Sequence, residues 1–526
     1  MSRVKRAAVL TVVLALLTGC HSAADSSAPS ALSDVPPPLV PAMDLPNDAV
    51  DHAVGQLDRI AGELMASSGI PGMAVAVVHG GKTLYAKGFG VKDIRAGDRP
   101  ENKVDTDTVF QLASLSKPLS ATVVAHQVGQ KAIDWDTPLV SKLPWFALSD
   151  PVVTQMVTIG DMFSHRSGLP DHAGDPLEDL GYDRRYVLDH LRQLPLDPFR
   201  ISYAYTNFGL TAGAEAVAVA AGKPWADLSD DVLYRPLGMT STSSRFADYQ
   251  ARADKAVAHI RFDNGYQPLY QRNADQQAPA GGASSSVNDM THWLTMMLAD
   301  GKYQGRQIVD AEALLPAITP QIVSSRATEP AMRSGFYGFG FNVGTTSAAR
   351  TQLSHSGAFE LGAATNVVLI PSADVAIVAL TNATPTGIPE TLTAEFADLV
   401  QFGRVREDWR KLYRDAFAPM DAPVGSLVGK TPPAHPAPAA PPQTYVGTYR
   451  NDYWGPAKIT ETAGKLSLSL GPRGEAWPLT HWDGNVFTFA FVSENSPPGS
   501  ISKATFDGNK LTLEYYDAEH RGTFTR

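Results

Sequence analysis

The chain has 526 residues, of which 44% are hydrophobic and 19% charged, and its formal net charge is -10. This composition can bury a large core, which excludes an intrinsically disordered chain and favours more than one domain. The charge is spread without long blocks of one sign, and no basic stripe with interleaved aromatic residues is present. Nucleic acid is therefore not an expected partner.

Residues 1–20 have the pattern of an export signal, with basic residues before the apolar run 7–17. That run is too short to span a bilayer, which takes about 20 residues. Its end, Leu17-Thr18-Gly19-Cys20, resembles a bacterial lipoprotein box, in which the cysteine is diacylated and becomes the mature N-terminus. Cys20 is also the single cysteine of the chain, so an internal disulfide is impossible.

We therefore expect a lipid anchor at Cys20, because two acyl chains tether a protein stably where one is marginal. The expected location is a bacterial cell envelope, on the outer face of the cytoplasmic membrane or on the outer membrane facing the periplasm. A plain secretory signal with an incidental cysteine is the alternative. No later segment is apolar over 18 residues, so no transmembrane helix is expected.

Two segments lack periodicity and divide the chain into domains. Residues 21–48 are rich in Ala, Ser, Pro and Asp and are expected to form a flexible spacer. Residues 419–443 are rich in proline and alanine, a composition typical of an extended linker. The expected domains are therefore a large one over 49–418 and a small one over 444–526.

The large domain is expected to combine a sheet with helices. Apolar residues of 54–64 recur at helical spacing, and 73–79 with 83–89 form a hairpin pattern around Gly80-Gly81. Near the other end, 364–369 and 375–380 are apolar strands, and helical stretches at 207–221 and 286–299 lie between. The pattern predicts an α/β (α+β) fold in which distant segments build one antiparallel sheet beside a helical subdomain.

The small domain is expected to be all-β. Apolar residues alternate with polar ones over 466–470 and 511–515, which places one face of each strand inside. Asp483-Gly484-Asn485 and Asp507-Gly508-Asn509 supply turns between such strands. Short strands with turns at this length predict a small antiparallel barrel or sandwich.

The first chemical motif is Ser-x-x-Lys, in which a lysine one helical turn after a serine can take the hydroxyl proton. The spacing occurs as Ser2 with Lys5, Ser114 with Lys117, and Ser500 with Lys503. The middle pair alone has helical context, because 119–128 has a helical pattern and Pro118 fits a first helical turn. Ser114 is therefore expected near a helix N-terminus, where backbone N–H groups favour an oxyanion. The alternative is a capping serine with a solvated lysine.

The second motif is Tyr205-Thr206-Asn207. A tyrosine held near a lysine ammonium can have a lowered pKa and move protons, and an asparagine amide can orient a substrate amide. The alternative is an aromatic loop that packs on the core.

The third motif is His355-Ser356-Gly357, which precedes the apolar strand 364–369. Gly357 is expected on an edge strand, where a substrate backbone can approach closely, and His355 can reach into the same cleft. His355 is expected to be mostly neutral at pH 7 and to gain a proton as the pH falls toward 6. A histidine that packs only for stability is the alternative.

Together the three motifs resemble the serine-active penicillin-recognising proteins and their class C beta-lactamase-like relatives, whose order is S-x-x-K, Y-x-N, K-T-G. The resemblance implies that Ser114 accepts the acyl group and that Lys117 and Tyr205 form the base system. It further implies that Asn207 contacts substrate and that the N–H groups of Ser114 and Ala358 form the oxyanion hole. Further matches are Ile70-Pro71-Gly72, Phe110-Gln111-Leu112-Ala113-Ser114, Phe163-Ser164-His165-Arg166-Ser167-Gly168-Leu169-Pro170, Pro236-Leu237-Gly238-Met239 and Gly281-Gly282-Ala283. The segment 444–526 resembles the lipocalin-like β domains that follow such hydrolases.

One departure from the family pattern bears on the substrate. His355 stands where beta-lactamases place a lysine that meets a substrate carboxylate, and it resembles the H-x-G of D-aminopeptidases and esterases. The sequence therefore predicts a serine hydrolase of small amides or esters, with a small molecule or peptide as substrate, rather than a true beta-lactamase. The alternative is a penicillin-binding or cell-wall-binding receptor or scaffold with slow or no turnover. No metal or nucleotide cofactor is implied.

Overall fold

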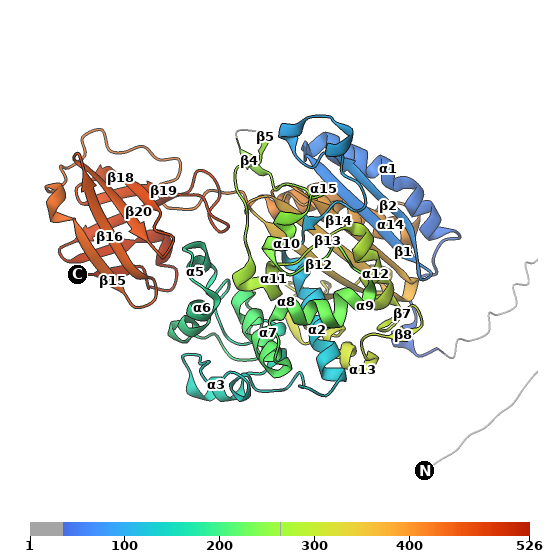
Figure 1. Ribbon diagram of the computed structural model, residues 1–526. Coiled ribbons are helices and arrows are strands. Elements are labelled where there is room, and N and C mark those ends of the chain that lie inside the picture. The colour runs from blue at the N-terminus through green and yellow to red at the C-terminus, as the bar shows by residue number, and fades with distance from the viewer. Residues whose placement is uncertain (1–34, 263–264) are drawn as a thin grey trace, which may run out of the picture. The chain divides into compact units, whose positions relative to one another are not determined.

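The computed structural model describes residues 35–262 and 265–526 (Figure 1). The predicted signal, Cys20 and the first half of the predicted spacer lie outside these residues. Residues from Ala42 to Arg526 form one compact unit. Within the described residues, no helix has the length and apolar character needed to cross a membrane.

An eight-stranded sheet forms the centre of the large domain, and all of its neighbouring strands are antiparallel. β1 (Gly72–His79) pairs with β14 (Val375–Thr381), so the two ends of the domain meet in the sheet. The strand order is β2-β1-β14-β13-β12-β11-β10-β9. The other bounds are β2 Lys82–Gly90, β9 Ile322–Ser325, β10 Gly335–Tyr337, β11 Asn342–Thr345, β12 Thr351–Phe359 and β13 Ala363–Ile370. The predicted antiparallel sheet from distant segments is confirmed.

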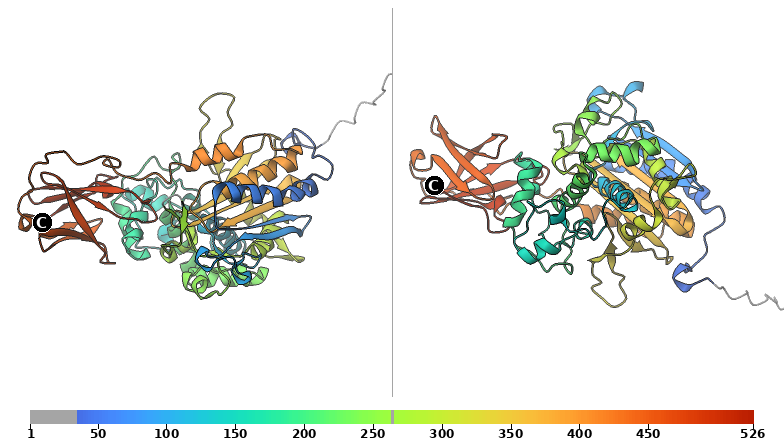
Figure 2. Two further views of the ribbon diagram at one scale, coloured as in Figure 1. Left: turned by 90° about the horizontal axis from the view of Figure 1, so that it is seen from above. Right: turned by 60° about the horizontal axis from the view of Figure 1, so that its bottom comes forward.

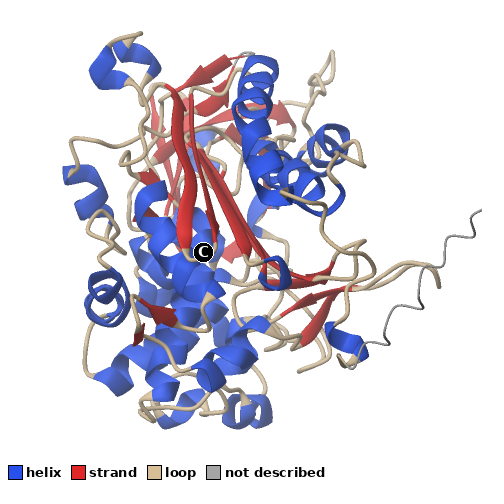
Figure 3. Cartoon of the chain, turned by 90° about the vertical axis from the view of Figure 1, so that its right-hand side faces the viewer, coloured by secondary structure: helices blue, strands red, loops and turns tan. Residues whose placement is uncertain are grey.

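Helices cover both faces of this sheet (Figure 3), which explains why β1 is apolar throughout rather than alternating. Met73, Val75 and Val77 pack with α1 (Ala49–Ser68) and α14 (Ile388–Phe402). The intervening residues of β1 face the other core, which contains α2 (Ser116–Gly129) and α12 (Val287–Leu298). The sheet is thus a buried platform, and α12 packs on one of its faces against β1 and β14.

The helical region lies between the two halves of the sheet in sequence, as predicted. Figure 2 shows its green helices gathered beside the cyan α2. The predicted helix 207–221 is α7 (Asn207–Ala221), which contacts both α2 and α4. The other bounds are α3 Pro151–Met156, α4 Ile159–Phe163, α5 Asp175–Asp179, α6 Arg184–His190, α8 Trp225–Ser229, α9 Arg235–Leu237, α10 Phe246–Ala251, α11 Ala278–Gly281 and α13 Ala311–Leu314. Three short strand pairs are β3 Phe110–Gln111 with β6 Ser284–Ser285, β4 Ile260–Phe262 with β5 Gly265–Gln267, and β7 Lys302–Tyr303 with β8 Arg306–Gln307.

The small domain is a closed barrel of eight antiparallel strands, which confirms the predicted all-β class. Its strands are β15 Gly447–Asn451, β16 Gly455–Thr462, β17 Lys465–Leu470, β18 Ala476–Asp483, β19 Val486–Ala490, β20 Ile501–Asp507, β21 Lys510–Leu513 and β22 Thr523–Thr525. The strand predicted over 511–515 ends at Leu513, because the next residues form the 3₁₀ turn Glu514–Tyr516 and hydrogen-bond to residues of β20. The Glu514 carboxylate accepts from Lys503 N, and Tyr515 N donates to Ser502 Oγ. The likeness to lipocalins stays a prediction.

The linker follows α15 (Trp409–Phe417), and the next element is the 3₁₀ turn Pro442–Thr444. Between them, Val424 is hydrogen-bonded to the barrel through both its N–H and its carbonyl group. Its N–H donates to Ser500 Oγ over 2.9 Å, and its carbonyl accepts from Ile501 N over 2.9 Å. This part of the linker is therefore fixed to the barrel.

Candidate active site

Ser114 lies in the 3₁₀ turn Ala113–Leu115, directly before α2. The preceding residue, Ala113, has a φ of +47°, a left-handed conformation that an alanine rarely adopts. Such strain is held only where the surrounding structure over-determines the backbone, and it concentrates at functional sites. Pro118 stands in the first turn of α2, where its missing N–H costs no helical hydrogen bond. The predicted placement of Ser114 at a helix N-terminus is confirmed.

Lys117 is fully buried, and its ammonium nitrogen is surrounded by three oxygen atoms. Nζ lies 2.9 Å from Ser114 Oγ, 2.7 Å from Asn207 Oδ1 and 3.0 Å from the Ala280 carbonyl oxygen. Burial lowers the pKa of Lys117 to about 7, although the charge of Asp175 opposes the shift. Lys117 is therefore poised to lose its proton near neutral pH.

When Lys117 is neutral, the atoms around its amine nitrogen determine where its two protons and its lone pair point. Asn207 Oδ1 and the Ala280 carbonyl can only accept, so each takes one amine proton. The remaining position, the lone pair, then faces Ser114 Oγ. An amine in this arrangement can accept the serine hydroxyl proton without any rearrangement.

Tyr205 lies on the other side of the serine, with its hydroxyl 2.9 Å from Ser114 Oγ. Its pKa is raised well above the usual value, mainly by burial, which the bond to Ser114 only partly offsets. A lowered pKa is therefore not found for this tyrosine, because desolvation of the phenolate and the nearby charges of Asp175 and Asp171 all raise it. Lys117 Nζ lies 4.5 Å from the centre of the ring, a distance at which a cation is attracted to the aromatic face. Tyr205 is placed as a neutral hydrogen-bond donor to Ser114.

Asn207 is the first residue of α7, and both ends of its amide are engaged. Oδ1 accepts from Lys117, and Nδ2 donates to Asp175 Oδ2 over 2.8 Å. In this arrangement Asn207 orients Lys117, and a substrate contact stays a prediction. The same carboxylate oxygen lies 2.8 Å from His172 Nδ1. Asp175 could not be identified from sequence, since it belongs to none of the motifs.

His355 lies on β12 and is buried with both ring nitrogens bonded. Nδ1 donates to the Ser356 carbonyl over 2.6 Å, which leaves Nε2 to accept from the Tyr337 hydroxyl at 2.8 Å. Burial and the nearby Lys117 lower the pKa of His355 to about 3. The expectation that this ring gains a proton near pH 6 is therefore wrong. Tyr337, which bonds Nε2 of this ring, was not identified from sequence.

Gly357 is needed for a different reason than the predicted one. β12 is not an edge strand, since it pairs with both β11 and β13, although the β11 pairing stops at Ser354. A Cβ on Gly357 would stand 2.2 Å from Leu112 O and 3.1 Å from Ser114 N. The absent side chain thus lets the segment that carries Ser114 approach β12. The backbones of the two predicted oxyanion-hole residues, Ser114 and Ala358, are brought close by this approach.

A cavity of about 550 Å³ opens over the serine. The predicted residues that line it are Ser114, Tyr205, Asn207, His355 and Ala358. Other lining residues, which the sequence did not reveal, are Tyr337, Arg272, Glu360 and Glu494. Burial raises the pKa of Glu360 to about 9 and that of Glu494 to about 8. The structure thus gathers the predicted residues around one cavity, with Glu494 contributed by the barrel domain.

The sequence matches the Beta-lactamase family over residues 57–401 and a domain of unknown function, DUF3471, over residues 431–515. It is 28% identical over 410 residues to "Unguisins hydrolase ungD'" of Aspergillus campestris, which covers 74% of this chain and 73% of that protein. It is 25% identical over 310 residues to "D-alanyl-D-alanine-carboxypeptidase/endopeptidase AmpH" of Escherichia coli, covering 57% of this chain and 71% of that protein.

Solved structures share the fold at low sequence identity. The octameric penicillin-binding protein homologue from Pyrococcus abyssi has a TM-score of 0.58 at 18% identity, covering 90% of this chain and all of that one. EstCE1, a hydrolase with promiscuous acyltransferase activity, has a TM-score of 0.56 at 19% identity, covering 67% of this chain and 99% of that one. Since the family match spans more than half of the chain, the protein belongs to the beta-lactamase family of serine hydrolases.

Proposed function

We propose that the protein hydrolyses small amides or esters through an acyl-enzyme on Ser114, in the manner of a D-aminopeptidase or esterase rather than a beta-lactamase. One observation carries this proposal. The buried Lys117 Nζ is hydrogen-bonded to two oxygens that can only accept, those of the Asn207 amide and the Ala280 carbonyl, and it lies 2.9 Å from Ser114 Oγ. That arrangement supplies a base for the serine at neutral pH.

The proposed reaction begins when neutral Lys117 takes the hydroxyl proton as Ser114 Oγ attacks the substrate carbonyl. The N–H groups of Ser114 and Ala358 bind the oxyanion that forms. The leaving group departs with a proton from the Tyr205 hydroxyl, and the Lys117 ammonium, which holds the proton taken from Ser114, returns a proton to the tyrosine before deacylation. Water then attacks the acyl-enzyme, and the same groups move its protons in reverse order.

The substrate preference rests on the charge of the cavity. The neutral His355 offers no fixed ammonium to a substrate carboxylate, and Arg272 is paired with Glu178 at 2.5 Å. Burial keeps Glu360 and Glu494 largely protonated at pH 7. The names of the relatives span peptide and ester hydrolysis, as the proposal does; a further relative is "Esterase EstB" of Burkholderia gladioli, 30% identical over 200 residues.

A panel of three substrates tests this preference. We expect kcat/KM for D-alanyl 4-nitroanilide and 4-nitrophenyl acetate, corrected for their uncatalysed hydrolysis, to exceed that for a chromogenic cephalosporin by about tenfold or more. The reason is that a charge-assisted hydrogen bond to the cephalosporin carboxylate, worth about 1.5–3 kcal/mol, is missing. The Ser114→Ala protein serves as the background control for each substrate. A cephalosporin that is hydrolysed faster than both others would contradict the proposed preference.

We also propose that the mature protein begins at an acylated Cys20 and is tethered to a membrane of the bacterial cell envelope. The support is the sequence Leu17-Thr18-Gly19-Cys20 and the absence of any other cysteine. We expect Cys20→Ser to release the protein or to leave its precursor uncleaved, as measured by membrane fractionation and N-terminal mass analysis. Normal processing and membrane attachment of the Cys20→Ser protein would refute the anchor.

A further inference from the structure

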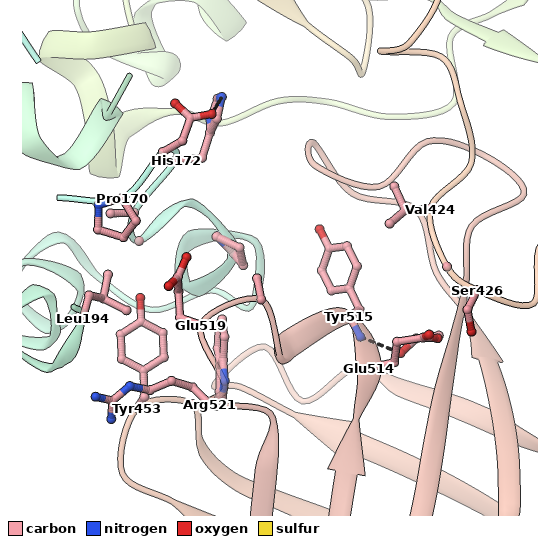
Figure 4. A pocket seen from close by; sticks show the side chains of 18 of the residues that line it. Pro170, His172, Leu194, Val424, Ser426, Tyr453, Glu514, Tyr515, Glu519 and Arg521 are labelled. Carbon is pink, nitrogen blue, oxygen red and sulfur yellow. Dashed lines mark hydrogen bonds and ion pairs between the residues drawn. The ribbon is translucent and has the colours of Figure 1, made fainter. Parts of the chain in front are cut away.

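A second cavity, of about 490 Å³, lies where the loop after Gly168, the linker and the barrel meet. Figure 4 shows the rings of Tyr453 and Tyr515 rising from the barrel, with Pro170 and Leu194 near the first and Val424 near the second. Trp454 also lines the cavity. A cavity of this size with an apolar, aromatic lining is typical of sites that enclose a small organic group.

The walls of this cavity are held in place by hydrogen bonds between the domains. The Tyr182 hydroxyl donates to the Trp454 carbonyl over 2.8 Å, and the Tyr186 hydroxyl donates to the Tyr453 carbonyl over 3.2 Å. On the other side, the linker is fixed to the barrel through Val424. The cavity is therefore formed before any ligand binds, so a guest loses little free energy to reorganisation.

Its polar groups favour a neutral or cationic guest over an anionic one. The carboxylates of Asp171 and Glu519 line the cavity with one guanidinium, that of Arg521, while the carboxylate of Glu514 is paired with Lys503 at 3.2 Å. A carboxylate guest therefore meets like charge, whereas a neutral or amine-bearing guest does not.

The second cavity adjoins the catalytic one, because His172 and Val424 line both. His172 also lies 2.8 Å from the Asp175 carboxylate that holds Asn207. We propose that the second cavity is a substrate subsite that receives a bulky apolar group, neutral or amine-bearing, of a substrate whose carbonyl lies at Ser114. This inference rests on the proposed function and adds a specificity role for the barrel and the linker.

Two substrate series test the subsite, one on each side of the scissile bond. The first consists of 4-nitrophenyl esters of ω-phenylalkanoic acids of increasing length, and the second of D-alanine amides of arylalkylamines. The test variant is Ala518→Phe, since Ala518 is exposed at the cavity and a phenyl ring there can fill it. The matched control is Ala476→Phe, an exposed alanine of the same barrel that does not line the cavity.

In at least one series we expect Ala518→Phe to lower the kcat/KM ratio of the longest to the shortest member by about tenfold or more. The reason is that burial of a phenyl ring strengthens association by about ten- to a hundredfold. Ala476→Phe should leave the ratio within about twofold of wild type, the usual size of a surface effect. An Ala518→Phe ratio equal to that of Ala476→Phe in both series would overturn the subsite.

A binding measurement separates failure of the subsite from failure of the proposed hydrolysis. Calorimetry with 4-phenylbutylamine and the Ser114→Ala protein should show binding that the added Ala518→Phe change weakens about tenfold or more. The added Ala476→Phe change should not weaken it. Absence of turnover together with this loss of binding would contradict the hydrolase and leave the subsite standing. Binding that is indifferent to Ala518→Phe would overturn the subsite even in an active enzyme.

Discussion

Ser114→Ala is expected to reduce kcat/KM for 4-nitrophenyl acetate by about 10⁴-fold or more, because the atom that forms the acyl bond is removed. Lys117 and Tyr205 then have no proton to handle, although Lys117 stays bonded to Asn207 and to the Ala280 carbonyl. The residual activity should therefore be nearly the same in Ser114→Ala and in the double variant with Tyr205→Phe. Such non-additivity is the property of groups that act as one unit.

The matched control for this substitution is Ser67→Ala, since Ser67 is exposed on α1 and bonds only the Leu64 carbonyl of its own helix. We expect it to keep wild-type kcat/KM. Circular dichroism should show that both serine variants are folded. If Ser114→Ala retains wild-type turnover while folded, Ser114 is not the nucleophile.

Lys117→Met is expected to lower kcat/KM by about 100-fold or more, the usual loss when a positioned acid-base group is removed. The pH profile gives the sharper test. Burial lowers the pKa of Lys117 to about 7, so the fraction of neutral amine, and with it kcat/KM of the wild type, should rise as the pH increases through 7. The rising limb should vanish in Lys117→Met.

The buried histidines do not account for such a limb. The pKa of His355 is about 3 and that of His165 lies well below its usual value, in both cases mainly through burial. His172 is different, because Asp175 raises its pKa although burial opposes the shift. His172→Gln is therefore the control, and the limb near pH 7 should persist in it. A limb that survives Lys117→Met and disappears with His172→Gln would assign the titration to the histidine.

Local pattern was sufficient for the parts of the site and the fold that depend on residue spacing. Ser114 and Lys117 were found because one helical turn separates them and Pro118 marks where that helix begins. The pattern of residues 207–221 indicates a helix and the apolar runs 364–369 and 375–380 indicate strands, and the observed bounds differ from these by one residue at most. Each of these features is determined by residues close together in sequence.

The predictions from sequence that the structure does not support concern properties set by residues far apart in the chain. The pKa of Tyr205 depends on burial by elements from several parts of the chain, and that burial reverses the shift expected from Lys117 alone. The requirement for Gly357 comes from Leu112 and Ser114, more than 200 residues earlier. Asp175 acts through its hydrogen bond to Asn207, which no spacing rule anticipates. Such contacts exist only once the sheet and the helical region are assembled.

The central claim is that Ser114 is the acylated nucleophile, and trapping the covalent adduct tests it most directly. The wild-type protein is incubated with a fluorophosphonate, its intact mass is measured, and the modified peptide is sequenced by mass spectrometry. We predict one adduct per chain, located on Ser114, with loss of esterase activity in step with labelling and no adduct in Ser114→Ala. Loss of activity that accompanies an adduct on another residue would contradict the claim. So would a Ser114→Ala protein that is labelled as fully as the wild type and hydrolyses the ester at the wild-type rate.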